Sequence, residues 1–237
     1  MQSKNNNQDF KLDNLFGNYV KGKVALVSGG EFIMLYTKMK RIKETLFIGS
    51  SGIGLMISQA LAVNGATVYI FSRTKEKLEN VVKKYNEENI EGKIVTLQGD
   101  ITSKEDINLL VKVLEKSEKK LDILVNNAGI AGDVTVNPNE NSAEKVKESL
   151  MKDTFENWEK VYRTNVTAAY FLTAACVPLL HQSTVSTPGW SSTVLNISSI
   201  SGLTKISQHH PAYNASKAAI IYLTKWVIVL CSLKYLN

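Results

Sequence analysis

Five short runs rich in apolar and β-branched residues recur along the chain, at 23–27, 65–71, 93–100, 121–129 and 192–199. Segments with the apolar spacing of a helix lie between them. Strands that carry apolar residues on both faces and alternate with helices form a parallel sheet that helices cover on both sides. The sequence therefore predicts an α/β protein built as a doubly wound parallel sheet, in three αβα layers.

The intervening helices are expected at 52–64, 74–88, 103–120, 154–180 and 211–230. The chain has 237 residues, enough for one well-buried domain of this kind. In an open parallel sheet the ligand binds at the carboxyl ends of the strands. Each predicted strand ends in a glycine-rich or polar motif, so we expect the functional residues at that edge.

The net charge of +6 does not by itself indicate a nucleic-acid partner. Residues 31–49 contain four basic and two acidic residues, a net charge of +2, and Lys234 adds one more. Half of the excess charge therefore comes from two segments. No stripe of basic residues with interleaved aromatics occurs elsewhere, so we expect no nucleic-acid binding.

Cys176 and Cys231 lie in apolar runs and are expected to be buried, reduced thiols. The three histidines have no cysteine or carboxylate at ligand spacing, so no metal site is expected. Residues 1–20 are polar and indicate a flexible extension without a signal sequence, and Lys225 interrupts the apolar stretch at 218–233. We therefore expect a cytoplasmic protein with no membrane partner.

A glycine-rich motif is split by the segment 31–49. The residues on its two sides are Ser28, Gly29, Ser51, Gly52, Ile53 and Gly54. A glycine turn that leads from a strand into a helix brings backbone N–H groups and the helix N-terminus to a pyrophosphate. The motif therefore indicates a dinucleotide site, and an ordinary loop between strand and helix is the alternative.

The second strand ends in Ser72 and Arg73, with Lys75 close behind. An acidic residue at this position would accept a hydrogen bond from the ribose 2′-hydroxyl of NAD, whereas a basic residue pairs with the 2′-phosphate of NADP. If a nucleotide binds, the sequence favours NADP(H) over NAD(H). The alternative is a solvated arginine at the start of a helix.

Tyr213 and Lys217 stand four residues apart in a predicted helix and so share one face of it. A free phenol titrates near 10, and an ammonium group beside it lowers that pKa. The pair could therefore exchange a proton with a substrate oxygen at neutral pH. A surface tyrosine and lysine without a catalytic role is the alternative.

These motifs, in this order, resemble those of the short-chain dehydrogenase/reductase family over residues 21–226 without 31–49. The matching elements are the split glycine motif, Asp100 at the end of the third strand, Asn127, Ala128 and Gly129 at the end of the fourth, Asn165 in the long helix, Ser199 in an SSxxG pattern, and Tyr213 with Lys217. The resemblance implies a Rossmann-type NAD(P)-binding domain. It also implies hydride transfer between a nicotinamide and a small alcohol or carbonyl substrate.

The resemblance further implies a role for each site residue. Tyr213 is the acid–base residue, and Lys217 also holds the ribose hydroxyls of the cofactor. Ser199 hydrogen-bonds the substrate oxygen, with Ser198 and Ser201 as alternatives, and Asn165 holds a water that relays protons. The remaining matches concern the cofactor: Asp100 contacts the adenine, and Asn127, Ala128 and Gly129 line the nicotinamide ribose.

Two segments depart from the family pattern, the insertion at 31–49 and the tail at 227–237. We therefore expect a flexible extension at 1–20 followed by an incomplete NAD(P)-binding domain at 21–237 that lacks the last strands. Because excision of 31–49 restores an unbroken motif, we hypothesise that both segments are translated non-coding sequence, which the mature transcript would test.

The same two departures bear on activity and assembly. The interrupted cofactor loop and the missing substrate-binding segment predict weak or absent activity, so a catalytically dead nucleotide-binding or interaction protein is the alternative function. Family members often form homo-oligomers through the helices expected at 154–180 and 211–230, and the departure after Trp226 argues against that assembly here.

Overall fold

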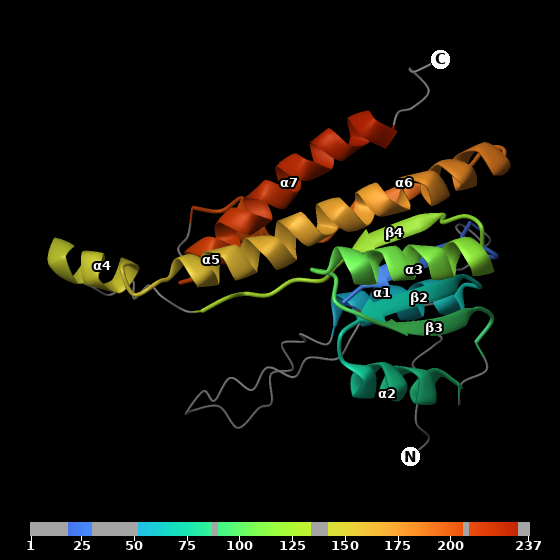
Figure 1. Ribbon diagram of the computed structural model, residues 1–237, viewed down its shortest axis with the longest axis horizontal. Coiled ribbons are helices and arrows are strands. Elements are labelled where there is room, and N and C mark those ends of the chain that lie inside the picture. Colours follow the sequence, from blue (N-terminus) through green and yellow to red (C-terminus); the bar gives the residue numbers. More distant parts are fainter. Residues whose placement is uncertain (1–18, 30–51, 87–89, 134–141, 206–208, 232–237) are drawn as a thin grey trace.

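The structure, a computed structural model, describes residues 19–29, 52–86, 90–133, 142–205 and 209–231. Among these residues, five strands form one parallel sheet in the order β3-β2-β1-β4-β5. Their bounds are β1 Val24–Ser28, β2 Thr67–Ser72, β3 Lys93–Gln98, β4 Ile123–Asn126 and β5 Thr193–Asn196. Figure 1 labels three of them, β2, β3 and β4. The predicted doubly wound parallel sheet is confirmed.

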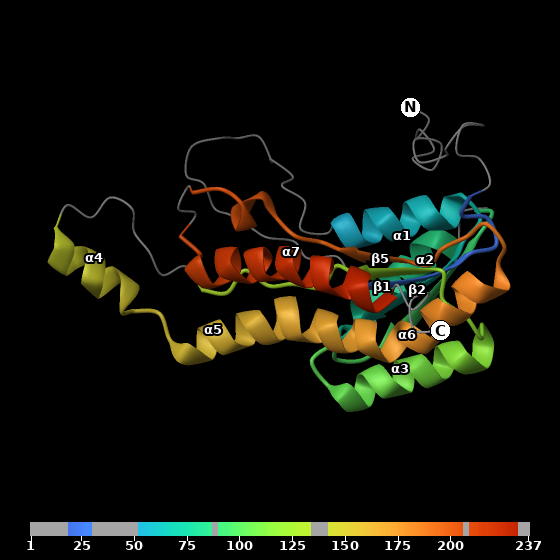
Figure 2. The same cartoon turned by 90° about the horizontal axis from the view of Figure 1, so that it is seen from above.

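The helices are α1 Ile53–Val63, α2 Lys75–Asn86, α3 Lys104–Ser117, α4 Ala143–Leu150, α5 Phe155–Tyr162, α6 Ala168–Ser186 and α7 Pro211–Cys231. Helices α1 and α2 pack on one face of the sheet, and α3 and α6 pack on the other (Figure 2). The chain winds from β1 outward to β3 and then returns to β4 on the other side of β1. This reversal beside β1 opens the crevice in which such sheets bind ligands.

The central strand β1 supplies both cores. Val24 and Leu26 pack with side chains of α3 and α6, whereas Ala25 and Val27 pack with those of α1 and α2. Successive side chains of a strand point to opposite faces, so this all-apolar run requires helices on both sides. Cys176 is a buried free thiol, as predicted.

Three predicted strands end earlier than the sequence suggested, and the long predicted helix ends later. β3 ends at Gln98 rather than 100, β4 at Asn126 rather than 129, and β5 at Asn196 rather than 199, because the residues that follow leave the sheet and form loops. The helix expected at 154–180 reaches Ser186 and contains a π-helical turn, η2 (Arg163–Thr167). Such turns leave a helix locally wider and are frequent at functional sites.

The edge of the sheet opposite the strands' carboxyl ends is fixed by a fully buried carboxylate, Asp122. It accepts hydrogen bonds from the Val24 amide at 2.7 Å and from the Ser183 hydroxyl at 2.6 Å. The ammonium groups of Lys23 and Lys120 lie 3.8 and 3.5 Å away. Because a buried charge is costly unless it is paired, this network ties β1, β4 and α6 together.

Helix α4 projects from the body of the molecule beyond the start of α5 (Figure 1). Leu150, Met151 and Phe155, at or after its end, are exposed apolar side chains. Within the ranges described above, none of the helices has the length and apolar character needed to cross a membrane.

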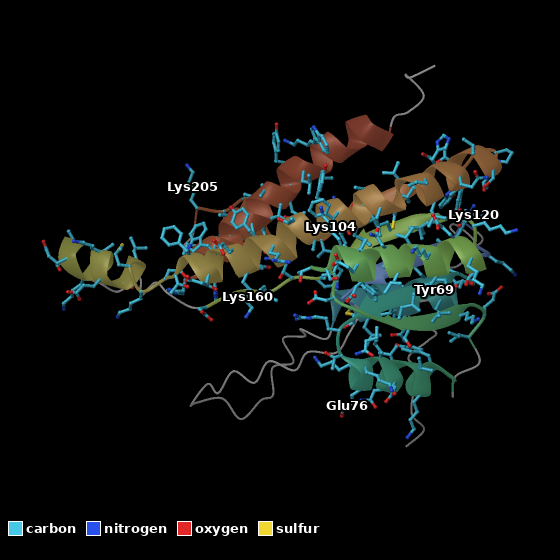
Figure 3. All side chains as sticks on the ribbon, viewed as in Figure 1. Tyr69, Glu76, Lys104, Lys120, Lys160 and Lys205 are labelled. Atoms are coloured by element: carbon cyan, nitrogen blue, oxygen red, sulfur yellow. The ribbon has the colours of Figure 1, made fainter. Side chains whose placement is uncertain are left out.

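Tyr69 on β2 reaches toward α3, and its hydroxyl donates a hydrogen bond of 2.7 Å to Glu118 (Figure 3). Burial, together with the Glu118 carboxylate, raises the pKa of Tyr69 to about 12. An unfolded tyrosine titrates near 10. Because the folded pKa is the higher one, this stabilisation is complete below pH 10 and is lost as the pH rises through 12.

We therefore expect Tyr69→Phe to lower the free energy of unfolding at pH 8 by about 1–2 kcal/mol. The difference from wild type should shrink between about pH 10 and 12. Urea unfolding across that range measures it, with Tyr19→Phe as the control because Tyr19 is exposed. A difference that stays constant with pH would contradict the assignment.

Candidate functional site

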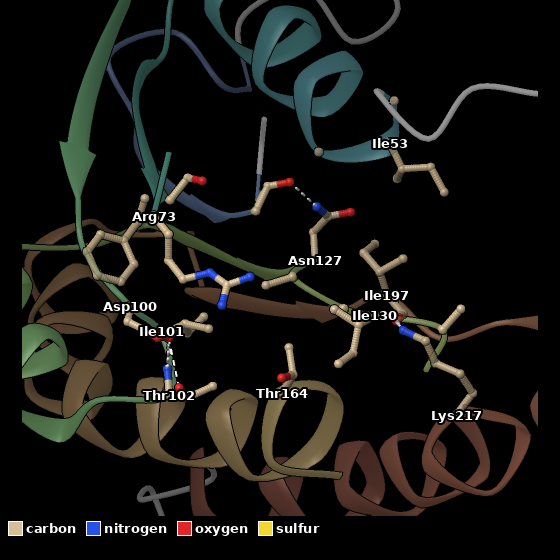
Figure 4. A pocket seen from close by; sticks show the side chains of 18 of the residues that line it. Ile53, Arg73, Asp100, Ile101, Thr102, Asn127, Ile130, Thr164, Ile197 and Lys217 are labelled. Atoms are coloured by element: carbon tan, nitrogen blue, oxygen red, sulfur yellow. Dashed lines mark hydrogen bonds between the residues drawn. The ribbon is translucent and has the colours of Figure 1, made fainter. Parts of the chain in front are cut away.

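A pocket of about 350 Å³ opens at the carboxyl ends of the strands, where the chain reverses beside β1. Figure 4 shows Arg73 and Asp100 on one side of it and Ile130, Ile197 and Lys217 on the other. Of the site residues that the sequence predicted, those that line this pocket are Gly29, Gly52, Ile53, Gly54, Ser72, Arg73, Asp100, Asn127, Ala128, Gly129, Tyr213 and Lys217. The structure therefore brings together most of the residues that sequence analysis selected from separate strand ends.

The ends of β1 and β4 are locked together at the floor of the pocket. The Asn127 side-chain amide donates to the carbonyls of Ser28 at 3.1 Å and Gly29 at 2.8 Å. The Ser28 hydroxyl in turn accepts from the backbone N–H groups of Asn127 and Ala128. Gly29 has φ of +67°, and a Cβ there would stand 2.7 Å from the Ala128 Cα. Only glycine fits this turn without a shift of backbone.

Helix α1 begins at the same pocket. Gly52 is its N-cap residue and provides no side-chain cap, so the first N–H groups of the helix remain available near Ile53 and Gly54. Both sides of the split glycine motif thus line one cavity. The insertion at 31–49 and the candidate Ser51 lie outside the described residues.

The β2 and β3 ends form a polar corner. Ser72 is buried, and its hydroxyl has no hydrogen-bond partner among the described residues. Asp100 accepts hydrogen bonds of 2.8 Å from both the amide and the hydroxyl of Thr102. Burial acts to raise the pKa of Asp100, but the Thr102 hydrogen bonds and the charges of Arg73 and Arg163 lower it below its ordinary value.

Lys217 occupies the opposite end of the pocket, and it is only 5% exposed. Its ammonium donates a hydrogen bond of 2.7 Å to the Ile197 carbonyl and lies 5.6 Å from the centre of the Tyr213 ring. Burial lowers the pKa of this ammonium. Tyr213 and Lys217 both lie in α7 and both line the pocket, and their catalytic roles stay a prediction.

The three candidate serines, Ser198, Ser199 and Ser201, follow β5 and have different surroundings. Ser198 lines the pocket, and its hydroxyl donates to the Lys217 carbonyl at 2.8 Å. Ser199 instead donates to the Ser201 hydroxyl at 3.0 Å and caps the short helix η3 (Ile200–Gly202), and it is not among the pocket-lining residues. Ser201 is buried. The choice between Ser199 and Ser198 as substrate donor stays a prediction.

Asn165 lies in the π-helical turn, and its side chain is buried, with 2% of the residue exposed. Its amide exchanges two hydrogen bonds with the backbone of Ile130, at 2.8 and 2.9 Å. It also donates to Ser216 at 2.9 Å, and Ser216 donates to the Tyr213 carbonyl. Asn165 therefore joins the loop after β4 to the helix that carries Tyr213 and Lys217.

Sequence analysis missed several residues of the pocket. Thr102, Ile130, Ala131, Thr164 and Ile197 all line it. Each directly follows or neighbours a motif residue, so proximity to the strand ends was the available signal. Their residue types gave no signal, because isolated threonine, isoleucine and alanine residues are common in loops and helices of every kind.

Comparison with known proteins places these features in a family. A family model for the short chain dehydrogenases matches residues 45–229. The short-chain dehydrogenase/reductase PhomF′ of Diaporthe leptostromiformis is 39% identical over 183 residues, which is 75% of this chain and 60% of that protein. The rhamnolipids biosynthesis 3-oxoacyl-(acyl-carrier-protein) reductase of Pseudomonas aeruginosa is 29% identical over 205 residues, 86% of this chain and 65% of that protein.

Among solved structures, the RhlG/NADP active-site complex of Pseudomonas aeruginosa superimposes with a TM-score of 0.66 at 27% identity. The match covers 90% of this chain and 67% of that chain. The chain spans about 60% of the length of PhomF′. From the matched family model, the shared sheet and the motifs gathered in one pocket, the chain belongs to the short-chain dehydrogenase/reductase family.

Proposed function

We propose that the protein is an NADP(H)-dependent oxidoreductase that interconverts a carbonyl group and an alcohol. The observation that carries the proposal is that one pocket is lined by Arg73 at one end and by Tyr213 and Lys217 at the other. The first residue type suits a phosphate, and the other two suit proton transfer to an oxygen. The RhlG/NADP complex supports a nicotinamide cofactor, and the choice of NADP(H) over NAD(H) rests on Arg73.

The residues present fit a dinucleotide. The open N-terminus of α1 and the tight turn at Gly29 suit a pyrophosphate, which needs close approach to backbone N–H groups. Arg73 and the unpartnered Ser72 hydroxyl would hold the 2′-phosphate. Asp100 would accept from the adenine amino group, and its lowered pKa keeps it an acceptor at neutral pH.

At the other end, the bound cofactor would supply the hydride that reaches the carbonyl carbon. Tyr213 would donate its hydroxyl proton to the carbonyl oxygen, so that an alcohol forms, and it would take the proton back in the reverse direction. Lys217 would hold the ribose hydroxyls and keep a positive charge beside the phenol. Ser199, with Ser198 as the alternative, would orient the substrate oxygen by a hydrogen bond.

The substrate class follows from this proton transfer and is a small molecule with a ketone or aldehyde group. The Pseudomonas relative is named for a 3-oxoacyl substrate, which contains a ketone, and this supports the class. The split loop is one reason to expect weak activity. Against that expectation, Gly29 and Gly52, on the two sides of the split, line the same pocket. A cytoplasmic location, the loss of the family's homo-oligomeric assembly and the non-coding origin of 31–49 and 227–237 stay predictions.

The first test removes the proposed acid. We expect Tyr213→Phe to retain NADPH binding but to lower kcat for ketone reduction by about 10²- to 10⁴-fold, the usual contribution of a general acid. NADPH oxidation followed at 340 nm with a panel of ketones, aldehydes and a 3-oxoacyl thioester measures it. Ser199→Ala and Ser198→Ala, assayed alongside, identify the substrate donor by the larger loss. Saturable NADPH binding without turnover in the wild-type chain would instead support a nucleotide-binding protein.

The second test concerns cofactor choice. Arg73→Ala should weaken NADPH binding by about 10- to 100-fold, the fold-change of a lost charge-assisted hydrogen bond, and leave NADH binding unchanged. Lys75 is a suitable control because its ammonium lies 3.6 Å from Glu79 on the exposed side of α2. Its alanine variant should change NADPH binding by less than about threefold. Equal losses for NADPH and NADH in the Arg73 variant would refute 2′-phosphate recognition.

The third test uses pH. Burial lowers the pKa of Lys217 below the ordinary value of 10.5, so the ammonium loses its proton at a lower pH than an exposed lysine does. Because the charged form would donate to the ribose hydroxyls, NADPH affinity should fall on the alkaline side with a midpoint below 10.5. Lys217→Arg should remove this fall, since a guanidinium stays protonated. An unchanged alkaline fall in that variant would exclude Lys217 as its source.

A further inference from the structure

The loop that follows β4, Gly129–Asp133, forms part of the pocket wall through Ile130 and Ala131. Asn165 holds its first part by pairing with both backbone polar groups of Ile130. Nothing in the composition of this loop would fix its position, because it consists of small or apolar residues before Asp133. Its position therefore depends on what holds its second part.

A second asparagine holds that second part. The Asn157 side-chain oxygen accepts a hydrogen bond of 3.0 Å from the Asp133 amide, and Asn157 is 7% exposed. Gly132, the residue before Asp133, has a φ of +72°. A Cβ at Gly132 would stand 2.6 Å from Val161 and 2.8 Å from the Asn157 oxygen. The loop thus presses directly onto α5, and its backbone conformation there is one that side chains disfavour.

Asn157 is itself fixed in orientation. Its amide nitrogen donates to Asp153 at 2.7 Å, and its backbone N–H donates to the Thr154 hydroxyl at 3.0 Å. Trp158 donates from its indole nitrogen to the other Asp153 oxygen at 2.8 Å. The amide oxygen of Asn157 is therefore aimed at the loop, since its nitrogen is committed to Asp153.

The π-helical turn explains how two asparagines eight residues apart reach one loop. In a regular α-helix that spacing would turn Asn165 about 80° away from Asn157. At the end of η2 the Ala168 N–H donates to the carbonyl of Arg163, five residues earlier, whereas an α-helical hydrogen bond spans four residues. A wider turn rotates less per residue, so it moves Asn165 toward the face of Asn157.

We propose that Asn157 is a positioning residue, which fixes how closely the Gly129–Asp133 loop lies against α5. It thereby fixes the position of Ile130 and Ala131 in the pocket wall at the substrate end. It lines no part of the pocket itself and acts through the loop. The inference rests on the proposed function for its kinetic consequence. Its structural consequence, the protection of the Asp133 amide, is independent of any activity.

The experiment compares Asn157→Ala with Trp158→Phe as a matched control. The control loses a hydrogen bond to Asp153 in the same helical turn but leaves the loop contact in place. We expect Asn157→Ala to raise KM for the best carbonyl substrate of the panel by about 3- to 10-fold, the fold-change of one neutral hydrogen bond. kcat and NADPH affinity should stay within about twofold, because the lost contact contributes uniform binding.

Hydrogen exchange provides the readout that does not depend on turnover. The amides of 130–133 should exchange faster in Asn157→Ala and at the wild-type rate in Trp158→Phe. Gly132→Ala should reproduce the Asn157→Ala result, since its new Cβ would push the loop off α5. Wild-type exchange and wild-type KM in Asn157→Ala would overturn the proposal, and so would equal losses in both Asn157→Ala and the control.

A second variant tests the orientation of the Asn157 side chain. Asn157→Asp keeps an acceptor for the Asp133 amide but faces the Asp153 carboxylate. KM and exchange should therefore rise, and wild-type values of both would count against Asn157 as the positioning group. If the wild-type chain shows no turnover, the proposed function fails, and the exchange results alone decide the loop.

Discussion

The contact between Gly29 and Ala128 is the constraint on which the site depends. The two backbones approach so closely that no Cβ fits at Gly29, and Asn127 bonds to the carbonyls on both sides of that turn. This fixes the ends of β1 and β4 relative to each other at the reversal of the sheet. The start of α1 and the Gly129–Asp133 loop are then built outward from a rigid junction.

The charged groups at the two ends of the pocket are stabilised in different ways. At the β2 and β3 ends, Asp100 lies among hydrogen-bond donors and the charges of Arg73 and Arg163, so it stays ionised. At the other end Lys217 is buried, and the Ile197 carbonyl is its hydrogen-bond partner. A desolvated ammonium interacts more strongly with a nearby phenol than a hydrated one does. One end of the pocket thus holds paired, ionised side chains, and the other holds a buried ammonium close to a phenol.

Local sequence patterns were sufficient to predict the sheet and the residues at its strand ends. Apolar runs and glycine turns depend on neighbours in sequence, so the strands and Gly29 could be placed without a structure. The i, i+4 spacing placed Lys217, whereas Asn127 was selected by the resemblance to the family. The π-helical turn and the role of Asn157 could not, because they depend on a loop that meets the helix only after folding. The position of Ser198 in the pocket wall, with its hydroxyl bonded to the Lys217 carbonyl, is a tertiary result of the same kind.

The pairing of β1 with β4 also sets an order of events during synthesis. Val24 and Asp122 are hydrogen-bonded although 98 residues separate them in sequence. At ribosomal rates of roughly 5–20 residues per second, β1 must wait about 5–20 s for that partner. Its other neighbour, β2, arrives earlier. One edge of the buried, apolar strand β1 is therefore unpaired on the nascent chain, and until β4 emerges that edge can pair with other chains.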